Sequence, residues 1–163
     1  MKTLLLMRHA KSSWKQTDLP DIDRPLNPRG ERDAPAMGGL LKDNELIPDL
    51  ILSSPAARAR RTAELVANMS HYEHEIVFVD KLYMAEPPDI LGALNLLPDE
   101  ITRVLLVAHN PGLEEALQLL TGEVESLPTA AIASISLPIE HWSELNDGTR
   151  GSLLKVWRPK ESP

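Results

Sequence analysis

Along the chain, short apolar runs alternate with longer stretches in which apolar and polar residues are mixed. Short apolar runs are typical of buried strands, and the mixed stretches have the spacing of surface helices. The apolar runs predict six strands, over residues 3–7, 50–52, 76–79, 104–108, 132–137 and 153–157. The runs at 76–79 and 104–108 are apolar throughout, which indicates parallel strands covered on both faces by helices.

The mixed stretches predict four helices, over residues 27–44, 54–69, 87–97 and 110–122. The first two share a start signal, in which a capping residue, Asn27 or Ser54, is followed directly by proline. Pro35, Gly38 and Gly39 disfavour a regular helix, so we expect the first helix to be bent or broken there.

This alternation of strands and helices predicts the fold class. It indicates an α/β protein, a three-layer α/β/α sandwich with a mostly parallel, six-stranded central sheet. The last two strands follow each other across the polar loop Asn146-Asp147-Gly148, and they either pair antiparallel at an edge or simply lie as neighbours. We expect a single domain over residues 1–158 and a flexible tail over residues 159–163.

Composition narrows the function classes. The chain has 163 residues, no cysteine and a formal net charge of −7. The lack of cysteine excludes disulfides, thiolate catalysis and cysteine-based zinc sites. The acidic balance disfavours nucleic acid as a partner, and no apolar run approaches membrane-spanning length. We therefore expect a soluble cytoplasmic protein without a nucleic-acid or membrane partner.

Polar residues of an unusual kind follow three of the predicted strands. Arg8 and His9 follow the first, and His109 follows the fourth. The second leads through two serines into a helix whose first turns carry Arg58, Arg60 and Arg61. The carboxyl ends of parallel strands meet at one rim of a sheet, where open α/β sheets bind ligands. These groups are therefore expected to converge.

The combination of arginine, histidine and a helix N-terminus favours an anion as the ligand. Arginine offers a planar fork of donors that matches phosphate oxygens, and histidine can act as a nucleophile near neutral pH. No phosphate-binding glycine loop and no aspartate cluster for magnesium is present. Metal-free phosphoryl chemistry is the resulting hypothesis. Taken singly, each histidine could be structural, and Arg60 and Arg61 could face water or pair with Glu64.

Four blocks of sequence resemble the histidine phosphatase superfamily, which includes the phosphoglycerate mutases. They are "MRHA" at 7–10, "DRPLNPRG" at 23–30, "SSPAARARRTAE" at 53–64 and "LLVAHNPGL" at 105–113. Within the superfamily, the "RHAKSSW" opening and "PTAAIASISL" at 128–137 are similar to the small phosphohistidine phosphatases of the SixA type. The resemblance covers nearly the whole chain.

The resemblance implies roles for individual residues. His9 would be the nucleophile, and Arg8, Arg58 and His109 would bind and stabilise the transferred phosphoryl group. Water would then release phosphate from phospho-His9, with no cofactor or metal. Arg24 would be a further phosphate contact, although an ion pair with a neighbouring aspartate, Asp21 or Asp23, is an equal alternative. The implied substrate is a histidine-phosphorylated protein of a phosphorelay or phosphotransfer system.

One position departs from the superfamily pattern, in which an acid after the third strand protonates the leaving oxygen. Glu86 is the nearest candidate, with Asp80 and Tyr83 weaker, and surface solvation is the better interpretation of all three. A missing acid penalises alkyl esters most, and so favours phosphohistidine as substrate. Two alternatives stay open. One is a phosphatase or mutase for small phosphate esters that uses Glu86 as acid, and the other is a non-catalytic phosphoprotein-binding module.

Overall fold

The computed structural model describes residues 1–160. Residues 161–163 of the predicted tail lie outside the described residues. The strands are β1 (Lys2–Arg8), β2 (Leu50–Ser53), β3 (Ile76–Phe78), β4 (Arg103–Ala108), β5 (Ile132–Leu137) and β6 (Ser152–Trp157). The helices are α1 (Pro28–Asp43), α2 (Ala57–Ser70), α3 (Pro87–Asn95) and α4 (Gly112–Thr121), with short 3-10 turns η1 (Asp21–Asp23), η2 (Asp80–Leu82) and η3 (Trp142–Glu144). None of the helices within residues 1–160 has both the length and the apolar character needed to cross a membrane.

All six strands form one sheet in the order β3-β2-β4-β1-β5-β6. The first four strands along the chain pair in parallel, which confirms the predicted mostly parallel sheet. β5 runs antiparallel to β1, and β6 runs antiparallel to β5 at the edge. Of the two arrangements open for the last two strands, antiparallel pairing is therefore the one observed.

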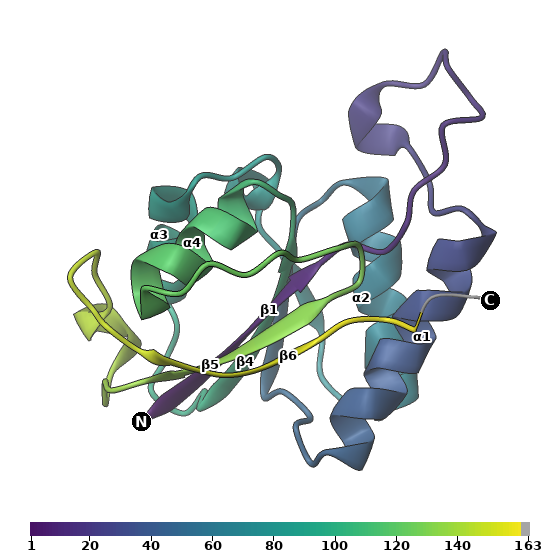
Figure 1. The fold of residues 1–163 in the computed structure, drawn as a ribbon. Helices are drawn as coiled ribbons and strands as arrows, with labels where there is room; N and C mark the ends of the chain where they lie inside the picture. Colours follow the sequence, from purple (N-terminus) through teal and green to yellow (C-terminus); the bar gives the residue numbers. More distant parts are fainter. Residues whose placement is uncertain (161–163) are drawn as a thin grey trace.

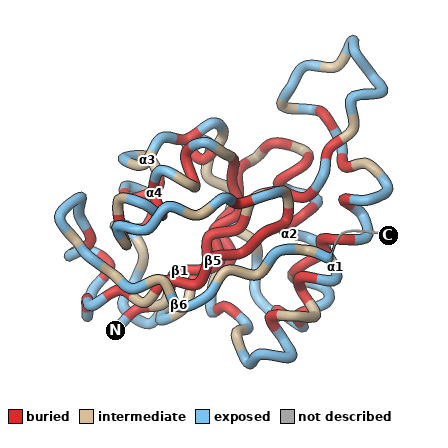
Figure 2. Tube along the Cα trace, viewed as in Figure 1, coloured by how far each residue is buried: buried red, intermediate tan, exposed pale blue. Residues whose placement is uncertain are grey.

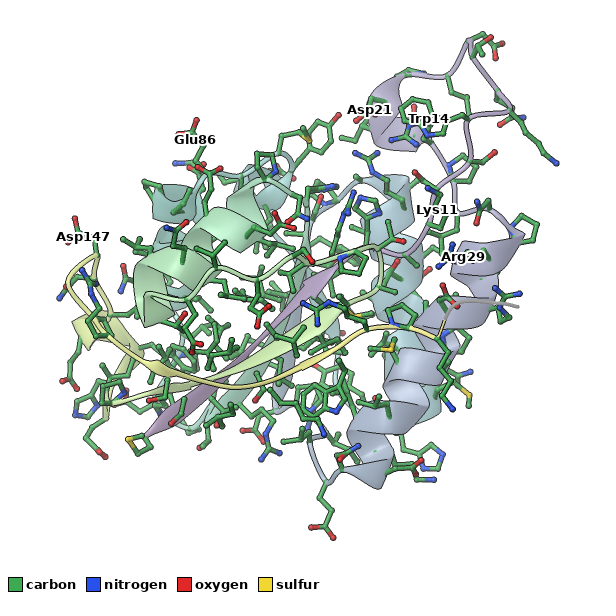
Figure 3. The ribbon with its side chains drawn as sticks, viewed as in Figure 1. Lys11, Trp14, Asp21, Arg29, Glu86 and Asp147 are labelled. Atoms are coloured by element: carbon green, nitrogen blue, oxygen red, sulfur yellow. The ribbon has the colours of Figure 1, made fainter. Side chains whose placement is uncertain are left out.

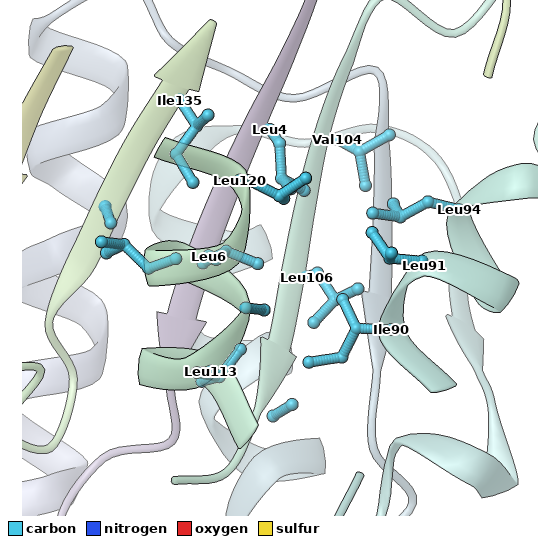
Figure 4. Close-up of a cluster of buried hydrophobic side chains, with 14 of the residues drawn as sticks. Leu4, Leu6, Ile90, Leu91, Leu94, Val104, Leu106, Leu113, Leu120 and Ile135 are labelled. Atoms are coloured by element: carbon cyan, nitrogen blue, oxygen red, sulfur yellow. The ribbon is translucent and has the colours of Figure 1, made fainter. Parts of the chain in front are cut away.

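Helices cover both faces of the sheet, which confirms the three-layer sandwich (Figure 1). Successive side chains of a strand point to opposite faces, so β1 serves two cores. Leu4 and Leu6 pack with α3 and α4, as the close-up in Figure 4 shows, whereas Leu5 and Met7 pack with α1 and α2. The sheet is accordingly buried along its centre (Figure 2). Because both faces of the sheet are tightly packed, the strands hold the residues that follow their ends in fixed positions.

The first helix is not broken where the sequence predicted a bend or a break. Asn27 caps α1 as expected, since its Oδ1 accepts from the Gly30 N–H at 2.9 Å. The helix then runs unbroken to Asp43, through Pro35 and both glycines. A Cβ at Gly38 would lie 2.7 Å from the Val66 carbonyl oxygen of α2. Gly38 therefore lets two helices approach closely, and the gain from packing outweighs its low helix propensity.

The predicted cap of the second helix is also wrong. α2 begins at Ala57 with Ala56 as its N-cap residue, and no side chain caps it. Ser54 lies before that turn, where its Oγ accepts from the Ala56 N–H at 3.2 Å. Its hydroxyl is thus placed at the end of β2 rather than on the helix.

Candidate active site

The ends of three neighbouring strands carry the predicted polar groups. β2, β4 and β1 are adjacent and parallel, so their carboxyl ends share one rim. The backbone ladder continues past the strands, with the His9 N–H donating to the Ala108 oxygen at 3.1 Å and the Ser54 N–H to the Val107 oxygen at 2.9 Å. These bonds hold the residues after each strand nearly as firmly as the strands themselves.

A cavity of about 320 Å³ opens at this rim. It brings together five of the six site residues named from the sequence, and Glu86 is the one left out. The residues lining it are Arg8, His9, Lys11, Ser12, Trp14, Asp21, Arg24, Arg58, Met84, His109, Asn110 and Thr129.

His9 is a buried, neutral imidazole with one nitrogen committed. Its Nδ1 lies 2.7 Å from the Ala10 carbonyl oxygen, which can only accept, so Nδ1 carries the proton. The lone pair is then on Nε2. Burial, together with the nearby Arg58 and Arg8 charges, lowers the pKa of His9 to about 4, although the hydrogen bond to Ala10 acts in the opposite direction. At neutral pH the ring is uncharged, which a nitrogen nucleophile requires.

His109 lies against His9, with ring centroids 5.2 Å apart. Its Nε2 is 2.8 Å from the Ser54 Oγ, which already accepts from the Ala56 N–H and can donate its own proton to His109. With Ser54 as the donor, the proton of His109 lies on Nδ1, a buried atom without a partner within residues 1–160. Burial lowers the pKa of His109 to about 3, and the His9 and Arg58 charges act in the same direction. His109 is thus suited to act as a neutral N–H donor.

Two guanidinium groups, of the buried Arg58 and the half-buried Arg8, have donors to spare. Arg58, in the first turn of α2, is 3% exposed and donates from both terminal nitrogens to Asp21. Arg8, at the end of β1, donates from Nη1 to the Leu127 oxygen at 3.2 Å. The Nε atoms of both are buried and have no partner in the described part of the chain. Such donors are costly unless paired, and a phosphoryl oxygen would pair them.

Arg24 forms the ion pair that the sequence offers as one alternative, while its contact with phosphate stays a prediction. It lines the cavity, and its Nε also donates to the Asp21 carboxylate at 3.2 Å. Its Nη1 bonds the Ser12 hydroxyl, and its guanidinium stacks on the Trp14 ring at 3.6 Å. Trp14 therefore packs against Arg24 while staying largely exposed. Asp23, the other aspartate considered, forms no side-chain hydrogen bond or ion pair with Arg24 within residues 1–160.

Asp21, which the sequence suggests only as an ion-pair partner of Arg24, also contacts Arg58 and Tyr83, and the sequence suggests Tyr83 only as a weaker acid candidate. Asp21 stands in η1, on the segment that projects from the body between β1 and α1 (Figure 1). The Tyr83 hydroxyl donates to its Oδ2 at 2.6 Å. This hydrogen bond, with those from Arg58 and Arg24, lowers the pKa of Asp21 to about 2. Nothing in the local sequence separates Asp21 from its neighbours Asp18 and Asp23.

The remaining candidates lie outside the cavity. Glu86 is the N-cap residue of α3, and its carboxylate points outward in Figure 3. Arg60 stacks on the Phe78 ring at 4.0 Å, and Arg61 pairs with Glu31 at 3.0 Å rather than with Glu64. Of the three arginines near the start of α2, only Arg58 reaches the site. Within residues 1–160, no three histidine, cysteine, aspartate or glutamate side chains are grouped so as to hold a metal ion.

Comparison with known sequences gives a family match over part of the chain and relatives over most of it. Residues 4–82 match the histidine phosphatase superfamily (branch 1). An uncharacterised protein of Mycobacterium leprae is 33% identical over 153 residues, which cover 92% of this chain and 92% of that protein.

Solved structures are similar over the whole fold. A protein of Agrobacterium tumefaciens assigned as phosphohistidine phosphatase SixA is 30% identical with a TM-score of 0.79, covering 97% of this chain and 99% of its own. A protein of Nakamurella multipartitia with the same assignment is 26% identical with a TM-score of 0.86, covering 97% of this chain and 96% of its own.

Proposed function

Because the chain belongs to the histidine phosphatase superfamily and is of the SixA type, we propose that it hydrolyses protein phosphohistidine through a phospho-His9 intermediate. The substrate would be a histidine-phosphorylated component of a phosphorelay or phosphotransfer system, and the product inorganic phosphate. The observation that carries the proposal is the neutral His9 ring, whose Nδ1 is held by the Ala10 oxygen in a cavity walled by guanidinium groups.

In the first step, His9 Nε2 attacks the phosphorus, and the bond from phosphorus to the substrate imidazole breaks. The substrate ring, protonated on its other nitrogen, leaves as neutral imidazole. The Arg8 and Arg58 guanidinium groups and the His109 N–H stabilise the oxygens of the transferred group. One P–N bond replaces another, so the step is close to balanced in energy.

In the second step, water attacks phospho-His9 and the P–N bond breaks. The proton on His9 Nδ1 stays there throughout, hydrogen-bonded to the Ala10 oxygen. His9 therefore leaves as neutral imidazole, and both protons of the water remain with the phosphate. Neither step demands a proton from a general acid.

The residues around the cavity favour phosphohistidine over phosphate esters. An alkoxide leaving group needs an acid, which typically supplies about 10²–10⁴-fold in rate. Glu86 lies outside the cavity, and the carboxylate of Asp21, with its pKa of about 2, is ionised at neutral pH. Hydrogen bonding to Asp21 raises the pKa of Tyr83, which keeps that phenol proton on the bridge to Asp21.

Rates on a phosphohistidine protein and on alkyl and aryl phosphates, for wild type and Glu86→Gln, test this preference. We expect the phosphohistidine protein to react fastest, with Glu86→Gln unchanged. Faster ester turnover that disappears in Glu86→Gln would support the small-ester phosphatase instead. Phosphate binding without turnover of any substrate would support a binding module.

A further inference from the structure

One carboxylate contacts the charged groups of the cavity. Asp21 is the only acidic residue among those lining the cavity. Its two oxygens accept from Arg24 Nε at 3.2 Å, Arg58 Nη2 at 3.0 Å and the Tyr83 hydroxyl at 2.6 Å. These donors come from the segment before α1, from α2 and from the turn after η2. Three separate parts of the chain therefore meet at one side chain.

The contact with Arg58 fixes more than a single bond. Nη2 donates to the carboxylate, and Nη1 donates to the backbone oxygen of the same residue, Asp21, at 2.8 Å. Two bonds from one residue set both the position and the plane of the guanidinium group. The Arg58 and Arg24 side chains are 4% and 9% exposed, whereas the Asp21 side chain is 46% exposed. Asp21 therefore holds two buried cations from the more open side.

Tyr83 extends the same network to the second histidine. Its ring meets the His109 ring edge-on, with centroids 5.6 Å apart. Figure 3 shows Asp21 beside Trp14 on the projecting segment, and both residues line the cavity. Asp21 thus links the arginines to the wall of the site that carries His109.

We propose that Asp21 is a positioning residue, which orients Arg58 and Arg24 to receive the phosphoryl group without contacting that group itself. This inference rests on the proposed function and names the residue that prepares the phosphoryl site. The cavity lining has three guanidinium groups and Lys11 against one carboxylate, a sum of three positive charges that favours a phosphoryl dianion. Donors held in place before binding cost less to order when the anion arrives.

The test is the affinity of the full chain for inorganic phosphate, measured by calorimetry for wild type and Asp21→Asn. We expect Asp21→Asn to bind phosphate about tenfold more weakly or worse, the size expected for losing a hydrogen bond to a charged group. Asp23→Asn is the matched control, because it removes the same charge from the same short turn without a side-chain contact in the described residues, and it should bind as wild type does. In turnover, Asp21→Asn should raise KM for a phosphohistidine protein more than it lowers kcat.

Either of two results for Asp21→Asn would overturn the proposal. Tighter phosphate binding by Asp21→Asn would mean that the carboxylate competes with phosphate, and unchanged binding with a lower unfolding midpoint would mean that it only holds the segment. If Asp21→Asn fails to fold, Asp21→Glu replaces it, with Asp23→Glu as control, and equal affinity of these two refutes the proposal. Phosphate affinity needs no turnover. If the wild type binds phosphate but never hydrolyses phosphohistidine, the proposed function is overturned. The role of Asp21 is then still decided by the phosphate affinities of the Asp21 and Asp23 variants.

Discussion

Replacing His9 with glutamine should make the fold less sensitive to acid. Burial lowers the pKa of His9 from its ordinary value of 6.5 to about 4 in the folded protein. Between these two pH values the unfolded chain binds a proton that the folded chain does not, so stability falls as the pH falls. The stability that the neutral His9 ring contributes is fully present above about pH 6.5 and is progressively lost as the pH falls toward 4. Glutamine has no such titration.

The expected size of the effect follows from the shift. One pKa unit corresponds to about 1.4 kcal/mol, so the shift to about 4 is worth about 3 kcal/mol in total. About 2 kcal/mol of this is lost between pH 7 and pH 4.5. The carboxylates and the other histidines also titrate in this range, but they do so in both proteins, so the difference between wild type and His9→Gln reports His9 together with its effect on His109.

Urea unfolding at pH 7 and pH 4.5 measures this difference. Wild type should lose about 2 kcal/mol more free energy of unfolding than His9→Gln over that interval. Equal losses in the two proteins would refute the reasoning, because they would mean that His9 protonates in the folded state as easily as in the unfolded chain.

Two further predictions concern the candidate active site and the packing of the fold that supports it. Arg58→Met should lower kcat/KM on a phosphohistidine protein by about 10²–10³-fold, since it removes a donor to the transferred oxygens, and a loss below tenfold would contradict that role. Gly112→Ala places a Cβ within the contact distance of the Ala85 carbonyl oxygen and should cost about 1–3 kcal/mol of stability in thermal unfolding. Its control is Gly92→Ala, where nothing lies within 4 Å and a gain of about 0.5–1 kcal/mol is expected. Similar midpoints for the two alanine variants would argue against the close contact.

The strands and the convergence of the site are features that the sequence predicts well. An apolar run such as Leu4 to Met7 has few ways to be buried other than in a covered sheet, so the local sequence is enough to predict the strand. Once the sheet is parallel, geometry brings the strand ends together, and Arg8, Arg58 and His109 all line one cavity. Position along the chain was enough to infer proximity.

Features that depend on distant partners escaped prediction. Pro35 and Gly38 disfavour a helix locally, but Gly38 packs against Val66, which lies on another helix. The partner of Arg61 is Glu31 rather than the nearby Glu64, because α1 lies alongside α2. Local propensity is a weak guide wherever tertiary packing contributes more energy.

Asp21 shows the same limit within the site. Its contacts with Arg58 and Tyr83 join residues that lie far from it in sequence, and no local pattern indicates them. Glu86 shows the converse, because the sequence favours surface solvation for it and its carboxylate at the start of α3 points outward (Figure 3).

The central claim is that the phosphoryl group passes through His9, and rapid-quench labelling tests it most directly. Wild type and His9→Ala are mixed with a radiolabelled histidine-phosphorylated protein, quenched in alkali and separated from the substrate. The account predicts label on wild type that is stable in alkali and released by acid, and no label on His9→Ala. Equal labelling of His9→Ala, or turnover by wild type with no labelled chain at any time, would contradict it.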